Sequence, residues 1–386
     1  MGVLLVVMFI VFVAIGVPIS FALGVVSFTG IASLGQIPNL VVFQKMFNGL
    51  NSFTLLAVPL FILAANLMNE GEITEKLIDC CNSLVGHLRG GLAYSNVLVS
   101  MIFAGISGSS QADTAGVGKI FIPAMEKQGY DKGTSVGVTA ASSTLGSIIP
   151  PSITMVVYAG IANVSTGALF MSGLVPGILL GLAMMAVVKY YSKRKNFPKC
   201  ERVPFKEVCR RTFQSLPALL TPIILIETMK LSSLSLFALA TANALGELLA
   251  YYQLNVVVQN FFANMPGGRL VFLLVVVAFF MFVGTFMDAV PAMILFVPII
   301  LPAAISLQIS PIILGLIIVV TLALGLVTPP YGLCLLIASS ISGITIEDAF
   351  KGTLPYFLSS IAVLLLLVIF PNFWLAIPAT LFPGLF

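Results

Sequence analysis

The sequence predicts an all-α membrane protein that crosses the bilayer many times and is built from two diverged repeats. Of its 386 residues, 59% are hydrophobic and only 8% are charged, which leaves too little polar surface to cover a soluble globule. Apolar stretches long enough to span a hydrocarbon core of roughly 30 Å recur along the chain, and in lipid such segments are helical. Glycine and proline interruptions recur in the same order in both halves, which predicts an inverted-repeat architecture.

Six segments follow from the apolar runs and the charges. They are N-terminal scaffold helices (1–51), a first repeat with an interfacial arm helix, a hairpin and a broken helix (52–188), a basic linker (189–211), a scaffold segment that looks truncated (212–230), a second repeat with its own hairpin and broken helix (231–370), and a C-terminal anchor containing Trp374 (371–386). The linker holds nine Lys or Arg residues and two Glu, so the positive-inside rule places it in the cytoplasm. The arm helix at 70–89 has the amphipathic pattern of a helix lying in the membrane interface.

The evidence for the repeat is that glycine and proline residues recur at matching positions; matching leucines alone would mean little in so apolar a chain. Matching positions are Pro123 and Pro302, Gly146 and Gly325, and the pairs Pro150–Pro151 and Pro329–Pro330; a slightly different register also pairs Asp113 with Asp288. Residues 1–51 have no counterpart in the second half. Either the chain has lost about two helices, or residues are missing near Glu227.

Residues 107–114 interrupt the first repeat with the polar sequence Ser-Gly-Ser-Ser-Gln-Ala-Asp-Thr. Such a segment cannot face lipid, so it predicts the tip of a re-entrant helical hairpin whose backbone groups line a cavity or a ligand. Residues 284–288 stand at the same place in the second half. Duplicated, broken membrane segments of this kind are typical of the substrate site of a secondary transporter.

The double prolines also interrupt helices, because proline removes a donor and disfavours α geometry in the residue before it. The carbonyl groups that they release lie beside several Ser and Thr residues, with one carboxylate expected in each half. An all-oxygen environment suits a small, hard cation. Because the chain has neither a calcium-binding loop nor a His/Cys ligand set, we expect sodium.

Three charged residues within the predicted spans allow two interpretations each. Asp113 and Asp288 are candidate ligands because ionisable groups at this depth are usually functional, but either could instead cap a helix start, and the two roles are compatible. Lys119 could meet an anionic substrate, or its side chain could extend to the cytoplasmic edge.

Catalysis is not expected. His87 is the only histidine, and the five cysteines have no metal-binding spacing and form no evident disulfide framework. An enzyme would need a nucleophile with a base or a metal set, and a channel would need a filter motif or a symmetric pore. A coupled transporter is the function class that remains best supported.

Three motifs resemble one known family. The runs at 108–118 (Gly-Ser-Ser-Gln-Ala-Asp-Thr-Ala-Gly-Val-Gly), 149–152 (Ile-Pro-Pro-Ser) and 327–332 (Val-Thr-Pro-Pro-Tyr-Gly) resemble the large membrane subunit of tripartite ATP-independent periplasmic (TRAP) transporters. The likeness covers essentially the whole chain, and the second half is most similar to the sialic-acid members. One departure is that the second half lacks the opening helices that the family normally has there.

The resemblance implies an elevator-type, sodium-driven importer in the bacterial inner membrane, with a small four-helix membrane subunit and a periplasmic substrate-binding protein as partners. By motif position, it implies sodium ligands at Ser109, Ser110, Asp113, Ser142, Thr144, Gly146 and Pro150, and at Gly284, Thr321, Gly325 and Thr328. It implies substrate contacts at Ser107, Ser152, Asp288 and Tyr331.

We therefore expect sodium-coupled import of an organic acid, with sialic acid first and a C4-dicarboxylate-like carboxylate second. Alternatives are a carboxylate symporter that needs no binding protein, a proton-coupled symporter and, less favoured, a channel. No nucleic-acid partner is expected.

Overall fold

The computed structural model describes residues 2–17, 19–34, 38, 40–50, 81–198, 241, 244, 248, 252–263, 267–330, 332–381 and 383. Every regular element among these residues is a helix, which confirms the all-α class. Within the same residues, three helices are long and apolar enough to cross a membrane: Thr166–Arg194, Ala289–Ser306 and Ile346–Ile369. Most of the remaining apolar helices are shorter, as expected where breaks divide a span.

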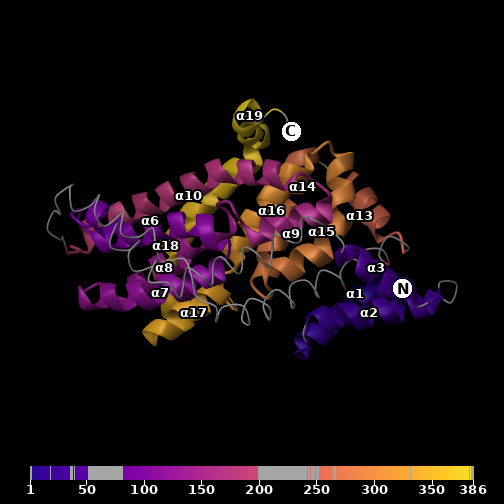
Figure 1. Ribbon diagram of the computed structural model, residues 1–386, viewed down its shortest axis with the longest axis horizontal. Coiled ribbons are helices and arrows are strands. Elements are labelled where there is room, and N and C mark those ends of the chain that lie inside the picture. Colours follow the sequence, from indigo (N-terminus) through magenta and orange to yellow (C-terminus); the bar gives the residue numbers. More distant parts are fainter. Residues whose placement is uncertain are drawn as a thin grey trace, which may run out of the picture.

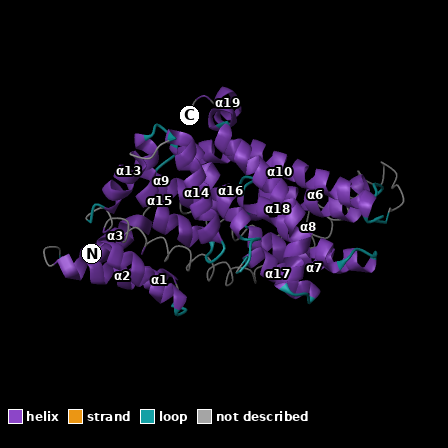
Figure 2. Cartoon of the chain, turned by 180° about the vertical axis from the view of Figure 1, so that it is seen from behind, coloured by secondary structure: helices purple, strands orange, loops and turns teal. Residues whose placement is uncertain are grey.

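The opening helices α1 (Gly2–Ala14), α2 (Ile19–Leu34) and α3 (Leu40–Leu50) lie at one end of the molecule (Figure 1). Helices α6 (Gly91–Ser107), α7 (Ser110–Lys127) and α8 (Lys132–Ser143) lie toward the opposite end, and the view from behind agrees (Figure 2). The expected truncated segment 212–230 and most of the linker and of the arm helix lie outside the described residues; residues 81–85, at the end of the arm, are helical.

The first half continues with five helices and a short 3-10 turn. They are α6 (Gly91–Ser107), α7 (Ser110–Lys127), α8 (Lys132–Ser143), η2 (Thr144–Ser147), α9 (Ile153–Ala162) and α10 (Thr166–Arg194). Helices α6 and α7 pack against each other and are separated by two residues, so they form the expected hairpin. Helix α8 passes through η2 into the double proline, and α9 begins directly after it.

The second half repeats this order. After α13 (Leu254–Ala263) come α14 (Gly268–Gly284), α15 (Ala289–Ser306), α16 (Pro311–Gly325), α17 (Leu333–Ser342), α18 (Ile346–Ile369) and α19 (Pro371–Leu381). The tip between α14 and α15 has four residues, two more than the tip between α6 and α7. Because of this difference, the helices before the two tips (α6 and α14) correspond at a shift of 177 residues, and the helices that begin after them (α7 and α15) at a shift of 179.

The two halves pack reciprocally. Helix α17 packs on α7, and the corresponding helix α9 packs on α15; likewise α18 packs on α8, and α10 packs on α16. Exchanging the halves converts each contact into its partner, which is the relation expected for repeats related by a two-fold axis. The broken helices α8 and α16 are buried along almost their whole length, so they form the core of the molecule.

Close helix contacts in this core depend on small residues, as is usual in membranes. A Cβ atom added to Gly137 on α8 would lie 2.3 Å from the backbone of Gly352 on α18. The C-terminal helix α19 packs against the helix before it through Trp374, which is only 5% exposed and whose Nε1 donates to Leu366 O at 3.3 Å.

Candidate functional site

The tip of the first hairpin is closed by a glycine and a serine cap. Helix α6 ends at Ser107 because Gly108 takes a φ of +63°, a conformation that glycine adopts without strain. Helix α7 then begins with Ser109 as N-cap, whose Oγ accepts the backbone N–H of Ala112 at 3.4 Å. The tip touches the first double-proline break, since the N–H of Ile153 donates to Gly108 O at 3.1 Å.

Five buried residues from the tip and from the broken helix form what we call the first-half cluster: Ser107, Ser110, Asp113, Thr144 and Ser147. Ser107 Oγ donates to Asp113 Oδ1. Ser110 Oγ lies 2.7 Å from Ser147 Oγ and donates to the Thr144 carbonyl at 3.2 Å. The structure thus brings a carboxylate, hydroxyls and a backbone carbonyl together, as the sequence predicted for these residues.

The second carboxylate oxygen of Asp113 is the unusual atom of the cluster. Asp113 Oδ2 is buried and has no hydrogen-bond partner among the described residues. The broken helix lies directly against it, because a Cβ atom added to Gly146 would stand 2.5 Å from Oδ2. A buried polar atom without a partner costs several kcal/mol, so this oxygen is suited to accept a cation or a proton.

Neither Asp113 nor Asp288 caps a helix with its side chain, for a different reason in each case. Asp113 lies within the first turn of α7, where Ser109 is already the cap, so Asp113 does not cap this helix. Asp288 does occupy the N-cap position of α15, but its side chain makes no capping hydrogen bond. Instead its Oδ1 accepts a hydrogen bond from Gln111 Nε2 at 2.7 Å.

Other predicted residues of the first half have their hydroxyl groups occupied. Ser142 Oγ lies 2.8 Å from Ser100 Oγ and donates to Asn96 Oδ1 at 3.3 Å, so it belongs to a separate buried network between α6 and α8. Thr144 Oγ1 donates to Ala141 O, and only its carbonyl faces the cluster.

Ser152, a predicted substrate contact, caps α9. Its Oγ accepts the N–H of Met155 at 3.2 Å and donates to Ser147 O at 2.6 Å. Through the bond to Ser147, the completely buried Ser152 connects the break to the cluster. Pro150, a predicted ion ligand in the same break, is half-buried. Ser107, the other first-half residue assigned to substrate, uses its hydroxyl on Asp113.

The second half offers fewer side-chain oxygens. Gly284 and Gly325 touch, since a Cβ atom added to Gly325 would lie 2.7 Å from Gly284 Cα. Thr321 Oγ1 donates to Ile317 O at 2.7 Å within α16, and Thr328 Oγ1, in the turn that follows, donates back to Leu324 O of α16 at 2.9 Å. Tyr331 lies outside the described residues.

The helix starts correct the expected pairing of Asp113 with Asp288. Because Ser109 and Asp288 are the N-caps of α7 and α15, these two residues correspond. Asp113 then corresponds to Ala292, and in the same register Ser110, Thr144 and Ser147 correspond to Ala289, Ala323 and Leu326. The expectation of one equivalent carboxylate per half is therefore wrong: the two acids occupy different positions and have different surroundings.

Three polar residues near the site were not singled out from the sequence. Gln111 and Asn96 make the hydrogen bonds described above, and Cys334 on α17 lies buried beside Thr114. In the sequence, each of these residues is only a polar residue within a run of apolar or small residues. Such a pattern does not indicate which side chain will be its hydrogen-bond partner. Lys119 is exposed on α7.

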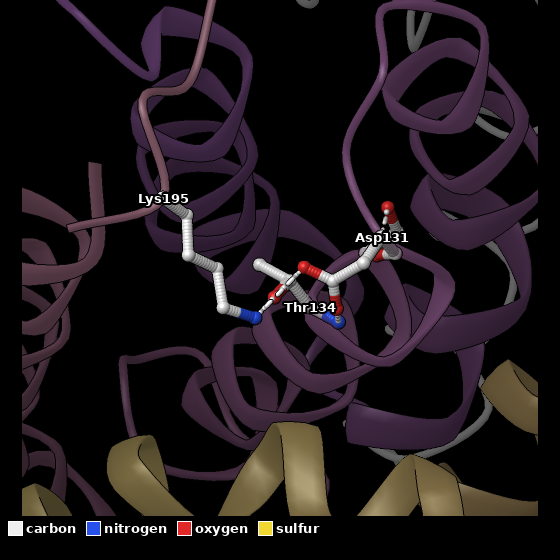
Figure 3. A network of polar contacts seen from close by, with 4 residues as sticks. Asp131, Thr134 and Lys195 are labelled. Carbon is white, nitrogen blue, oxygen red and sulfur yellow. Dashed lines mark hydrogen bonds and ion pairs between the residues drawn. The ribbon is translucent and has the colours of Figure 1, made fainter. Parts of the chain in front are cut away.

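A second polar network lies at the start of α8, away from the cluster (Figure 3). Asp131 caps α8 by accepting the N–H of Thr134 at 2.8 Å, and Lys195 Nζ lies 2.8 Å from Asp131 Oδ2. Partial burial alone would raise the pKa of Asp131, but the hydrogen bonds from Lys195 and Thr134 outweigh it and lower the pKa below its usual range. This network ties the end of α10 to the turn before α8.

Comparison with known proteins assigns the fold and the motifs to one family. Residues 6–236 and 224–373 match the family described as the tripartite ATP-independent periplasmic transporter, DctM component. The chain belongs to this family. It thus belongs to a family of membrane transporter subunits, as the tip and break motifs indicated.

Relatives of this chain are named for different substrates. It is 31% identical to the sialic acid TRAP transporter large permease protein SiaM of Vibrio cholerae, with 87% of this chain and 88% of SiaM covered. It is 33% identical to the C4-dicarboxylate TRAP transporter large permease protein DctM of Pseudomonas aeruginosa, with 86% and 88% covered. The fold is also similar to the YdaH transporter of Alcanivorax borkumensis, with a TM-score of 0.61 at 14% identity over 86% of this chain and 88% of that one.

Proposed function

We propose that this DctM-family protein couples the inward movement of sodium to the import of an organic acid across the bacterial inner membrane. The observation that carries the proposal is the buried, unpartnered Oδ2 of Asp113 in the first-half cluster. Hydroxyl, carbonyl and carboxylate oxygens are the ligands that hard cations prefer. A cation here would neutralise the only carboxylate of the cluster and satisfy its free oxygen.

The coupling follows from the position of the cluster. The hairpin tip supplies Ser110 and Asp113, and the broken helix supplies Thr144 and Ser147. An ion bound between them would hold the tip against the break and so stabilise the form that binds substrate. Moving one charge through about 100 mV supplies roughly 2.3 kcal/mol, so two sodium ions would support substantial accumulation.

The substrate class and the partners are carried over from the family resemblance. We propose a carboxylate substrate, sialic acid or a C4-dicarboxylate-like acid, because relatives named for each are similarly distant from this chain. A periplasmic binding protein would deliver it, and a small membrane subunit would complete the scaffold. The hairpins and broken helices would move together as the transport domain of an elevator.

Proton coupling is the second candidate, and the same atom favours it. A buried carboxylate without a countercharge is satisfied by a proton as well as by a cation. In that case Asp113 would carry the proton, and sodium would leave the protein unaffected.

Thermal unfolding of the purified full-length chain separates the two candidates. Sodium should raise Tm of the wild type, and the Asp113→Asn variant should lose this rise because the neutral amide attracts a cation much less. Asp131→Asn is the matched control: it removes an acid outside the cluster and should keep the sodium-dependent rise. If Tm of the wild type responds to pH but not to sodium, the sodium proposal is wrong and proton coupling takes its place.

A further inference from the structure

The two hairpin tips are joined by a direct hydrogen bond. Gln111 is the second residue of α7, and its Nε2 donates to Asp288 Oδ1 at 2.7 Å across a separation of 177 residues in sequence. This contact links the first repeat to the second at the N-terminal ends of α7 and α15.

Asp288 is free to make this contact because its own helix does not use it. It stands at the N-cap of α15 without a side-chain capping bond, whereas the corresponding Ser109 does cap α7. Asp288 is also partly exposed, while Asp113 is completely buried. Of the two acids, Asp288 is therefore the one that a substrate could contact at the surface.

The contact occurs in one direction only. In the register fixed by the N-caps, the residue of α15 that corresponds to Gln111 is Val290, which has no polar side chain. The amide of Gln111 has a second N–H and a carbonyl oxygen besides the N–H given to Asp288. The pair thus fixes the direction of the carboxylate while leaving polar capacity for a ligand.

We infer that Gln111 is a positioning residue that fixes the direction of the Asp288 carboxylate where the two hairpin tips meet and ties the placement of both tips to substrate binding. The inference rests on the proposed transport function for its consequence, but the hydrogen bond itself can be tested without transport. When the bond is lost, Asp288 turns toward its own helix, and a substrate must reorder it at the expense of affinity.

A charge exchange tests the bond. In Gln111→Glu two carboxylates face each other, so Tm of the purified full-length chain should fall. Adding Asp288→Asn restores one amide and one carboxylate, so the double variant should regain Tm relative to Gln111→Glu alone. Losses of Tm that simply add in the double variant would show that the two side chains do not interact. The sodium-dependent rise in Tm is measured in the same samples. It tests the proposed function, whereas the charge exchange tests the hydrogen bond.

Uptake tests the positioning role in cells that express the chain with its small membrane subunit and binding protein. N-acetylneuraminate and succinate serve as the probes. For whichever is transported, Gln111→Leu should raise KM about tenfold or more, as expected for losing a hydrogen bond to a charged group, with a smaller change in maximal rate. The Gln111→Asn variant keeps the amide and should recover part of the affinity. An unchanged KM in Gln111→Leu overturns the inference, and so does a double variant that fails to regain Tm, because without the bond Gln111 cannot position Asp288.

Discussion

At the residue scale, the proposed ion site depends on one oxygen atom. Asp113 Oδ2 is buried without a partner, and the backbone of the broken helix at Gly146 closes the space beside it. The burial of Asp113 distinguishes it from the partly exposed Asp288, which faces the other hairpin. This difference is the reason for proposing that the ion binds at Asp113 and the substrate at Asp288.

Gly146→Ala tests the space beside this oxygen. The new Cβ atom would lie 2.5 Å from Asp113 Oδ2 and 2.9 Å from the backbone of Ser109, so the tip and the break must separate. We expect the sodium-dependent rise in Tm to disappear while the protein still inserts into the membrane. Gly105→Ala is the control, because its nearest neighbour, Pro150 O, lies at an ordinary 3.6 Å. An equal sodium response in both variants would contradict the assignment.

The sequence predicted the acid and the hydroxyls of the first-half cluster but not their pairing. Asp113 and Ser110 could be identified because polar residues inside apolar spans cannot face lipid and must contact other polar groups. The role of Gln111 could not, since the contact depends on how two segments 177 residues apart meet. The equivalence of Asp113 and Asp288 was inferred from aligning the sequence with itself. The N-cap positions show instead that Asp288 corresponds to Ser109.

At the element scale, the hairpins and breaks were predictable and the packing around them was not. Glycine and paired prolines have local backbone consequences, so the ends of α6 and of α8 could be placed from the sequence. The separate network of Ser142 with Asn96 and Ser100 could not, because it needs α6 and α8 in a particular rotation.

The crossing of α8 and α18 is a testable element contact. Gly137→Ala would place a Cβ atom 2.3 Å from the backbone of Gly352, so the helices must move apart, and overpacking of this kind costs about 1–3 kcal/mol. Gly133→Ala on the same helix face meets its nearest atom at 3.4 Å and should be tolerated. Thermal unfolding in detergent compares them, and an equal Tm for the two variants would show that this crossing is looser than described.

At the scale of the whole molecule, the internal repeat explains both the fold and its asymmetry. Reciprocal packing of α7 with α17 and of α15 with α9 brings the two halves together around shared breaks. Divergence then left hydroxyls and a carboxylate in the first-half cluster and apolar residues at the corresponding positions of the second half. Any ion in the second half would rely mainly on backbone carbonyls near Gly284 and Gly325.

The most direct test of the central claim is a pair of density maps of the purified full-length protein, one in sodium and one in a large organic cation. The account predicts a density peak in the sodium map alone, between the hairpin tip and the broken helix, in contact with Asp113 Oδ2 and with oxygens of Ser110 or Thr144. Identical maps with no peak beside Asp113, or a basic side chain paired with Oδ2, would contradict it.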